Sequence, residues 1–87
     1  PHILIVDDNA TNRVVAQALC EMFGCTSETA EAGLEALEAV QARPFDLVLM
    51  DGQMPKMDGY AATEAIRQRE RQSGTHLPIV ALTAHSL

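Results

Sequence analysis

Four polar residues that could carry out phosphoryl chemistry follow short apolar runs in this chain. Asp7 and Asp8 come after ILIV, Asp51 comes after LVLM, and Thr83 comes after IVAL. Carboxylates that gather in one place raise each other's pKa unless a cation lies among them. A hard divalent ion such as Mg²⁺ suits a few carboxylates, water and a phosphate oxygen. One carboxylate could then act as a nucleophile and form an acyl phosphate, while the hydroxyl donates to a phosphoryl oxygen.

The apolar runs that precede these residues predict β-strands. Residues 2–6, 46–50 and 77–82 each contain a short apolar run, a pattern typical of strands that are buried on both faces of a parallel sheet. The segment CTSETA, residues 25–30, predicts a weaker strand. Four strands in one sheet would bring their carboxyl ends to a common edge.

Three helices are predicted between the strands, over residues 10–23, 33–43 and 60–71. Gly24 and Pro44 supply stop signals, and Asn9 or Thr11 could cap the start of the first helix. The apolar residues that recur at helical spacing are Val15, Ala18, Leu19 and Met22 in the first helix, Leu34, Leu37 and Val40 in the second, and Ala62, Ala65 and Ile66 in the third. Glu35 and Glu38 are expected on the outer face of the second helix, and residues 72–76 in a loop.

The order β-α-β-α-β-α-β predicts a single α/β domain over residues 1–87, with a parallel sheet and right-handed crossovers. Ligands of such sheets bind outside the carboxyl ends of the strands. We therefore expect Asp7, Asp8, Asp51 and Thr83 at one edge. Each has a structural alternative, because Asp7 to Asn9 could form a turn with a helix cap and Asp51 a strand-ending turn. The combination favours a functional site.

The composition limits the possible partners. The chain has 87 residues, of which 47% are hydrophobic and 3% aromatic, so its core must be aliphatic. A formal charge of −6 argues against a nucleic-acid partner, which requires a basic patch. The positive residues Arg67, Arg69 and Arg71 alternate with Gln68, Glu70 and Gln72 and predict a solvated helix end.

Cysteine usage and hydropathy indicate a domain of a reducing compartment. Cys20 and Cys25 match no spacing of metal ligands or redox motifs, so free cysteines in a core are expected. No apolar segment approaches the ~20 residues of a membrane span, and residues 3–6 are too short for a signal peptide. We expect a cytoplasmic domain without membrane contact.

Three segments resemble the receiver domain of two-component response regulators. They are ILIVDDNATNR (3–13), DLVLMDGQMPKMDG (46–59) and PIVALTA (78–84), in the order and at the separations of that family. The resemblance covers residues 2–87 and implies a flavodoxin-like, doubly wound parallel sheet. The sequence of residues 50–67 is similar to that of receivers attached to hybrid sensor histidine kinases.

The resemblance implies a role for each polar residue. Asp51 would accept a phosphoryl group from a histidine kinase or a histidine phosphotransfer partner. Asp7 and Asp8 would hold Mg²⁺, Asp8 more directly, and the backbone carbonyl of Gln53 would complete the metal site. Thr83 would be the switch hydroxyl that moves toward the phosphoryl group. Such a domain catalyses only the phosphorylation of its own aspartate and the hydrolysis of the acyl phosphate.

The sequence departs from the family pattern after the fourth strand. The family's fifth strand carries a lysine that pairs with the acceptor, and a switch aromatic; Lys56 is the only lysine of this chain and is in the wrong place to substitute. We expect one of two explanations for the missing fifth strand. Either these residues are part of a longer chain, or the chain forms a homodimer through the open edge of the fourth strand.

Two other functions remain open from the residues. A receiver-like module without phosphorylation could serve for docking or dimerisation, and the missing lysine favours it. An aspartyl-phosphate hydrolase would place its nucleophile in VDDNAT, residues 6–11, but enzymes of that type need a larger chain with a capping element.

Overall fold

The computed structural model describes residues 1–51, 59–74 and 77–82. These residues form seven elements in the predicted order: β1 (His2–Val6), α1 (Ala10–Met22), β2 (Thr26–Ala30), α2 (Gly33–Ala42), β3 (Leu47–Asp51), α3 (Gly59–Ser73) and β4 (Ile79–Leu82). The prediction of an α/β chain is confirmed. The largest difference in a strand is at β4, which begins two residues later than predicted, after Pro78. A proline has no N–H to donate to a strand ladder.

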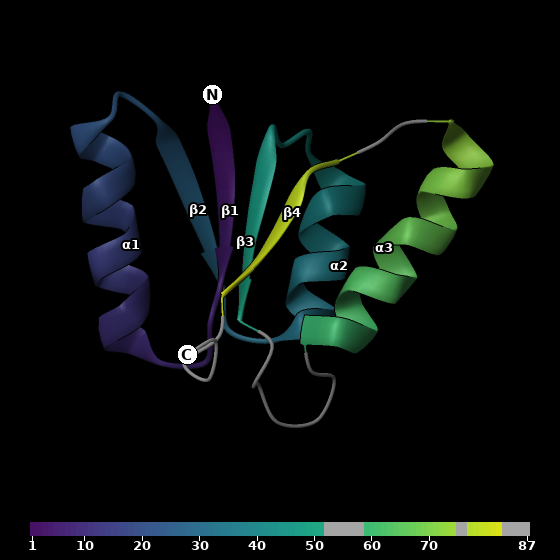
Figure 1. Cartoon of the computed structure of the whole chain (residues 1–87), viewed down its shortest axis with the longest axis horizontal. Helices are drawn as coiled ribbons and strands as arrows, with labels where there is room; N and C mark the ends of the chain where they lie inside the picture. The colour runs from purple at the N-terminus through teal and green to yellow at the C-terminus, as the bar shows by residue number, and fades with distance from the viewer. Residues whose placement is uncertain (52–58, 75–76, 83–87) are drawn as a thin grey trace.

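All strands are parallel, in the order β2-β1-β3-β4 (Figure 1). Helix α1 covers one face of the sheet, and α2 and α3 cover the other, which confirms a doubly wound sheet. Within the described residues β4 is an edge strand. Dimerisation through that edge stays a prediction.

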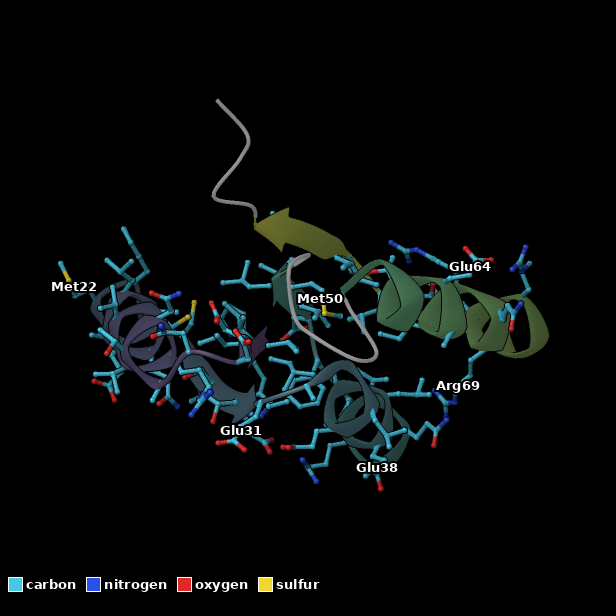
Figure 2. The ribbon with its side chains drawn as sticks, turned by 90° about the horizontal axis from the view of Figure 1, so that it is seen from below. Met22, Glu31, Glu38, Met50, Glu64 and Arg69 are labelled. Carbon is cyan, nitrogen blue, oxygen red and sulfur yellow. The ribbon has the colours of Figure 1, made fainter. Side chains whose placement is uncertain are left out.

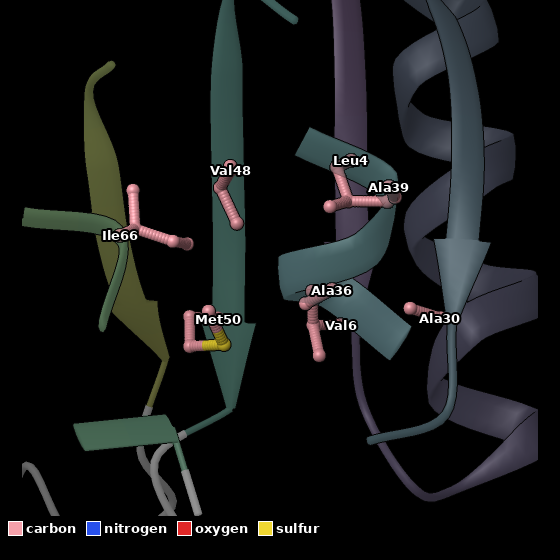
Figure 3. Close-up of a cluster of buried hydrophobic side chains, with 8 residues drawn as sticks. All are labelled: Leu4, Val6, Ala30, Ala36, Ala39, Val48, Met50 and Ile66. Carbon is pink, nitrogen blue, oxygen red and sulfur yellow. The ribbon is translucent and has the colours of Figure 1, made fainter. Parts of the chain in front are cut away.

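The core follows the two-residue period of β1. Leu4 and Val6 point toward α2 and α3, whereas Ile3 and Ile5 point toward α1. The larger cluster contains Leu4, Val6, Ala30, Ala36, Ala39, Val48, Met50 and Ile66 (Figure 3). The core is aliphatic, as the composition predicts, and it fixes the strands whose ends form the candidate site.

Helix α1 has a defined signal at each end. Asn9 is the N-cap, and its side-chain Oδ1 accepts a hydrogen bond from the Asn12 N–H at 3.1 Å, so the prediction that Asn9 could cap this helix is confirmed. At the other end Gly24 has φ +76°, a left-handed conformation that an L side chain rarely adopts. The helix therefore starts directly after the acidic turn and stops before β2.

The large apolar residues of α1 do not face the sheet. Val15, Leu19 and Met22 have exposed fractions of 54%, 50% and 77%, and Ala18 is also exposed. Met22 projects away from the sheet in Figure 2. The buried and half-buried residues are Arg13, Ala16, Gln17 and Cys20. Gln17 donates to Ser27 of β2 at 3.4 Å, so a polar contact helps set the side of α1 that meets the sheet. Apolar spacing alone did not reveal this contact.

The expected inner face of α2 is wrong in part. Leu34 is 58% exposed, and the small residues Ala36 and Ala39 occupy the inner face of α2. Leu37 and Val40 are half-buried against the core, as predicted. Small residues allow a helix to lie close to the sheet, which leaves the larger Leu34 at the margin.

The third helix differs in its last turns. Ile66 is buried and Ala65 half-buried, as predicted; the side chain of Ala62 lies outside the described residues. The predicted solvated end is wrong for Glu70, which is 9% exposed and accepts hydrogen bonds from Arg67 and from the Leu77 N–H. Arg67 also donates to the Leu77 carbonyl at 2.8 Å. These contacts tie α3 to the segment that leads into β4.

Candidate functional site

The carboxyl ends of β1, β3 and β4 lie at one edge of the sheet, the lower edge in Figure 1. Val6 pairs with Met50, so Asp7 and Asp51 occupy the next position of the same parallel register. Asp51 in turn pairs with Leu82, the residue before Thr83. The described backbone thus brings the positions of Asp7 and Asp51 together on neighbouring strands.

The local geometry holds Asp7 rigidly. Its N–H donates to the Ala30 carbonyl at 3.1 Å, which extends the β1–β2 ladder by one bond. Its carboxylate Oδ1 accepts the Asn9 N–H at 2.9 Å, and the residue is only 8% exposed. The second oxygen, Oδ2, has no hydrogen-bond partner among the described residues. A carboxylate that engages one oxygen in this way keeps the other as a possible ligand for an ion.

Asp8 differs from Asp7 in its surroundings. Its side chain is exposed, directly between the buried Asp7 and the helix-capping Asn9. The sequence left open whether these residues form a turn with a cap or a functional pair. The cap is present, and it leaves both carboxylates at the edge, so the two interpretations are compatible.

Arg13 supports this turn and was missed by the sequence analysis. Its Nη1 donates to the Asp7 carbonyl oxygen at 2.8 Å, and its Nη2 lies 3.2 Å from Oε1 of Glu31. Its side chain is mostly buried, with 15% exposed. A cation in the first turns of a helix opposes the helix dipole, so its presence was a usable signal that a specific contact holds it there.

The donor set at this edge fits a hard divalent cation. Asp7 contributes carboxylate oxygen, and the predicted partners Asp8, Asp51 and Gln53 would contribute oxygen as well. Within the described side chains, no group of three His, Cys, Asp or Glu residues could hold a metal ion. The Asp51 side chain, Gln53, Lys56 and Thr83 lie outside the described residues. The part of the candidate site that the structure describes is therefore the carboxylate of Asp7, its exposed neighbour Asp8 and the backbone of Asp51.

A cavity among the described residues lies away from this site. It has a volume of about 290 Å³ and lies between the ends of α2 and α3 and the amino ends of β3 and β4. Val40, Phe45, Ile66 and Leu77 line it.

Among the described helices, none is long and apolar enough to cross a membrane.

Curated relatives match the chain along nearly its whole length. The chain is 53% identical over 88 residues to the sensor histidine kinase GacS of Pseudomonas protegens. The matched region covers all of this chain and 10% of that protein. It is 42% identical over 85 residues to the signal transduction histidine-protein kinase BarA of Escherichia coli, of which it covers 9%. The chain thus spans about a tenth of the length of these relatives.

Solved structures show the same fold. The receiver domain of the histidine kinase CKI1 from Arabidopsis thaliana, complexed with Mg²⁺ and BeF₃⁻, superposes with a TM-score of 0.91 at 38% identity, covering 99% of this chain and 67% of that one. A Saccharomyces cerevisiae co-crystal structure contains the histidine phosphotransfer protein Ypd1 and the receiver domain of the response regulator Ssk1. It matches with a TM-score of 0.82 at 26% identity, over 94% of this chain and 61% of that one.

The family model of the response regulator receiver domain matches residues 3–87. This match, the identity to receivers of sensor histidine kinases and the parallel α/β sheet agree with one another. The chain belongs to the response regulator receiver domain family.

Proposed function

We propose that this domain is the phosphoacceptor of a phosphorelay and that Asp51 carries the phosphoryl group. The observation that supports this proposal most strongly is the register that brings the Asp51 position beside the rigidly held Asp7. An acid at the end of an inner parallel strand lies where ligands of such sheets bind. The carboxylate of Asp51 would attack the phosphorus atom and form an acyl phosphate.

Mg²⁺ is the proposed cofactor. Asp7, Asp8, Asp51 and the backbone carbonyl of Gln53 would hold it, and the ion would offset the charge that develops on the transferring phosphoryl oxygens. Two receiver structures similar to this chain were crystallised with Mg²⁺, which supports the assignment. In this chain, the Asn9 N–H donates to the Asp7 carboxylate and Arg13 donates to the Asp7 carbonyl, so both residues support the turn that would hold the ion.

The proposed phosphoryl donor is a phosphohistidine on a histidine kinase or a histidine phosphotransfer domain. The similarity to receivers of sensor kinases and to a receiver bound to a phosphotransfer protein supports this class of partner. Helix α1 starts beside the acidic edge and exposes Val14 and Val15, at 66% and 54%, which suits contact with another protein.

We further propose a cytoplasmic location, since the free cysteines agree with a reducing compartment.

Thr83 is the proposed switch residue. It follows Leu82, which pairs with Asp51, so its hydroxyl could donate to a phosphoryl group on that carboxylate. The resulting shift of the segment after β4 would change how partners bind.

Phosphotransfer from a phosphohistidine protein tests the proposal against the docking alternative. A phosphorylated histidine phosphotransfer domain is mixed with residues 1–87, and separately with the longest natural chain that contains them, with and without Mg²⁺. We expect Mg²⁺-dependent transfer to at least the longer chain and none to its Asp51→Asn variant. Binding without transfer in both chains would instead establish a docking module. Transfer to the longer chain alone would assign an essential group to residues beyond Leu87.

A further inference from the structure

The turn after α1 brings Cys20 and Cys25 together. The Cys25 N–H donates to the Cys20 carbonyl at 2.9 Å, and the Gly24 N–H donates to the Glu21 carbonyl at 3.0 Å. With Gly24 at φ +76°, these two bonds form a Schellman motif. In this motif the side chains of the first and last residues commonly contact each other, and here both are cysteines.

The backbone bond limits the separation of the two residues. The Cys25 nitrogen lies 2.9 Å from the Cys20 oxygen, so standard bond lengths keep the two Cα atoms within about 6.8 Å. Disulfides span Cα separations of about 4.4–6.8 Å. Both side chains also pack in the same apolar cluster with Ile3 and Ile5, so neither has to leave the core to meet the other.

The two thiols differ in access. Cys20 is 6% exposed, and its pKa is raised above the ordinary value by burial and by the nearby Cys25. Cys25 is half-buried, and its Sγ lies 3.8 Å from the Phe23 carbonyl oxygen at the surface. A reagent from solvent therefore reaches Cys25 first.

We propose that Cys20 and Cys25 are a redox pair that closes to an intramolecular disulfide in the presence of a hydroperoxide. The Cys25 thiolate attacks the peroxide, the O–O bond breaks, and a sulfenic acid forms on Cys25 as the first water or alcohol leaves. Cys20 then attacks the Cys25 sulfur, the S–O bond breaks, and the proton of Cys20 leaves with the hydroxide as water. The two thiols lose two electrons, and the peroxide gains them.

This redox pair lies far from the proposed phosphorylation site. Helix α1 has 13 residues, so its two ends are about 20 Å apart, with the acidic turn at the start and the cysteines at the end. Oxidation should therefore leave the acidic edge unchanged. The proposal does not depend on Asp51 accepting a phosphoryl group, and its test does not involve phosphate.

Thiol mapping of the folded chain tests the proposal. The chain is treated with hydrogen peroxide, unfolded without reductant and alkylated with iodoacetamide, and its mass is measured by intact mass spectrometry. We expect a monomer that has lost two hydrogen atoms, takes up no alkyl group and returns to two alkylated thiols after dithiothreitol. Two alkylated thiols after peroxide, or disulfide-linked dimers alone, would overturn the proposal.

Two matched variants assign the order of events. In Cys20→Ser the sulfenic acid on Cys25 has no resolving thiol, so dimedone should trap it. In Cys25→Ser the buried Cys20 should keep its free thiol under the same treatment. Dimedone adducts on Cys20 in Cys25→Ser, at the rate seen for Cys25, would contradict the assigned order.

Discussion

At the scale of single residues, the candidate site depends on how Asp7 is held. Its carboxylate is buried, one oxygen is fixed by the Asn9 N–H, and its backbone carbonyl accepts from Arg13. A carboxylate held in this way would lose little conformational freedom on binding the proposed ion, because its contacts already restrict it. The sequence could predict Asp7 and Asp8 as candidate ligands, since they follow a buried strand. The position of Arg13 near the start of a helix signals a specific contact, but the sequence does not identify its partners, because these depend on where the first turns of α1 lie.

We predict that Asp7→Asn weakens Mg²⁺ binding at least tenfold, about 1.4 kcal/mol. The change removes a charged ligand oxygen while keeping the size and the acceptor for the Asn9 N–H. Titration calorimetry with MgCl₂ measures the affinity.

Asp46→Asn is the matched control for this experiment. Asp46 accepts the His2 N–H at the opposite edge of the sheet, at 2.7 Å, so its substitution should leave Mg²⁺ binding unchanged. Equal affinities of Asp7→Asn and the unsubstituted chain would remove Asp7 from the metal site.

At the scale of elements, polar contacts decide what apolar spacing could not. The order of strands and helices along the chain followed from apolar runs and helix stop signals. The inner face of α1 did not, because Gln17 contacts Ser27 of β2 and Arg13 contacts Glu31, which follows β2. Likewise, Glu70 of α3 is buried because the Leu77 N–H and Arg67 satisfy it. A sequence shows charge, whereas these partners become neighbours only when the elements pack.

A second polar cluster joins β1, β2 and the end of α2. Glu28 accepts from the His2 ring at 2.7 Å and from Nε of Arg43 at 3.0 Å, and the His2 ring stacks on Phe45 with centroids 5.0 Å apart. The hydrogen bond from His2, followed by that from Arg43, lowers the pKa of Glu28 below its ordinary value of 4.5. Because the folded state favours the charged carboxylate, Glu28 stabilises the fold above pH 4.5, and this contribution is lost as pH falls below it.

Glu28→Gln should therefore be less stable than the unsubstituted chain at pH 7, and the difference should shrink as pH is lowered from about 4.5 toward 3. Urea unfolding at several pH values, followed by circular dichroism, measures this difference. Glu38→Gln, a change of an exposed carboxylate on α2, serves as control and should show little effect at any pH. A Glu28→Gln difference that stays constant with pH would contradict the role of the ionised carboxylate.

At the scale of the whole molecule, two largely aliphatic clusters, one on each face of the sheet, hold the strands whose ends form the candidate site. Leu4 of β1 and Val48 and Met50 of β3 are essentially fully buried between the sheet and helices α2 and α3 (Figure 3). The composition predicted an aliphatic core, and the two-residue period of β1 divides it between the two faces. The strand order β2-β1-β3-β4 was not predicted, because the physical pattern of runs and turns does not by itself select which strand lies in the middle.

Leu4→Ala should destabilise the fold by about 2–5 kcal/mol, because it removes fully buried methyl groups and leaves a cavity. Leu34→Ala, the same chemical change at a residue that is 58% exposed, should cost far less. Thermal unfolding of the two variants side by side measures the difference. Similar losses in both would contradict the packing of α2, in which Ala36 and Ala39 rather than Leu34 face the sheet.

The most direct test of the central claim is to find which residue carries the phosphoryl group. The longest natural chain that contains residues 1–87 is incubated with Mg²⁺ and acetyl phosphate, the acyl phosphate is reduced with borohydride, and the reduced residue is mapped by peptide mass spectrometry. We predict that homoserine replaces aspartate at position 51 alone, and only when Mg²⁺ is present. Reduction at another acid, or none under conditions in which a related receiver is modified, would contradict the account.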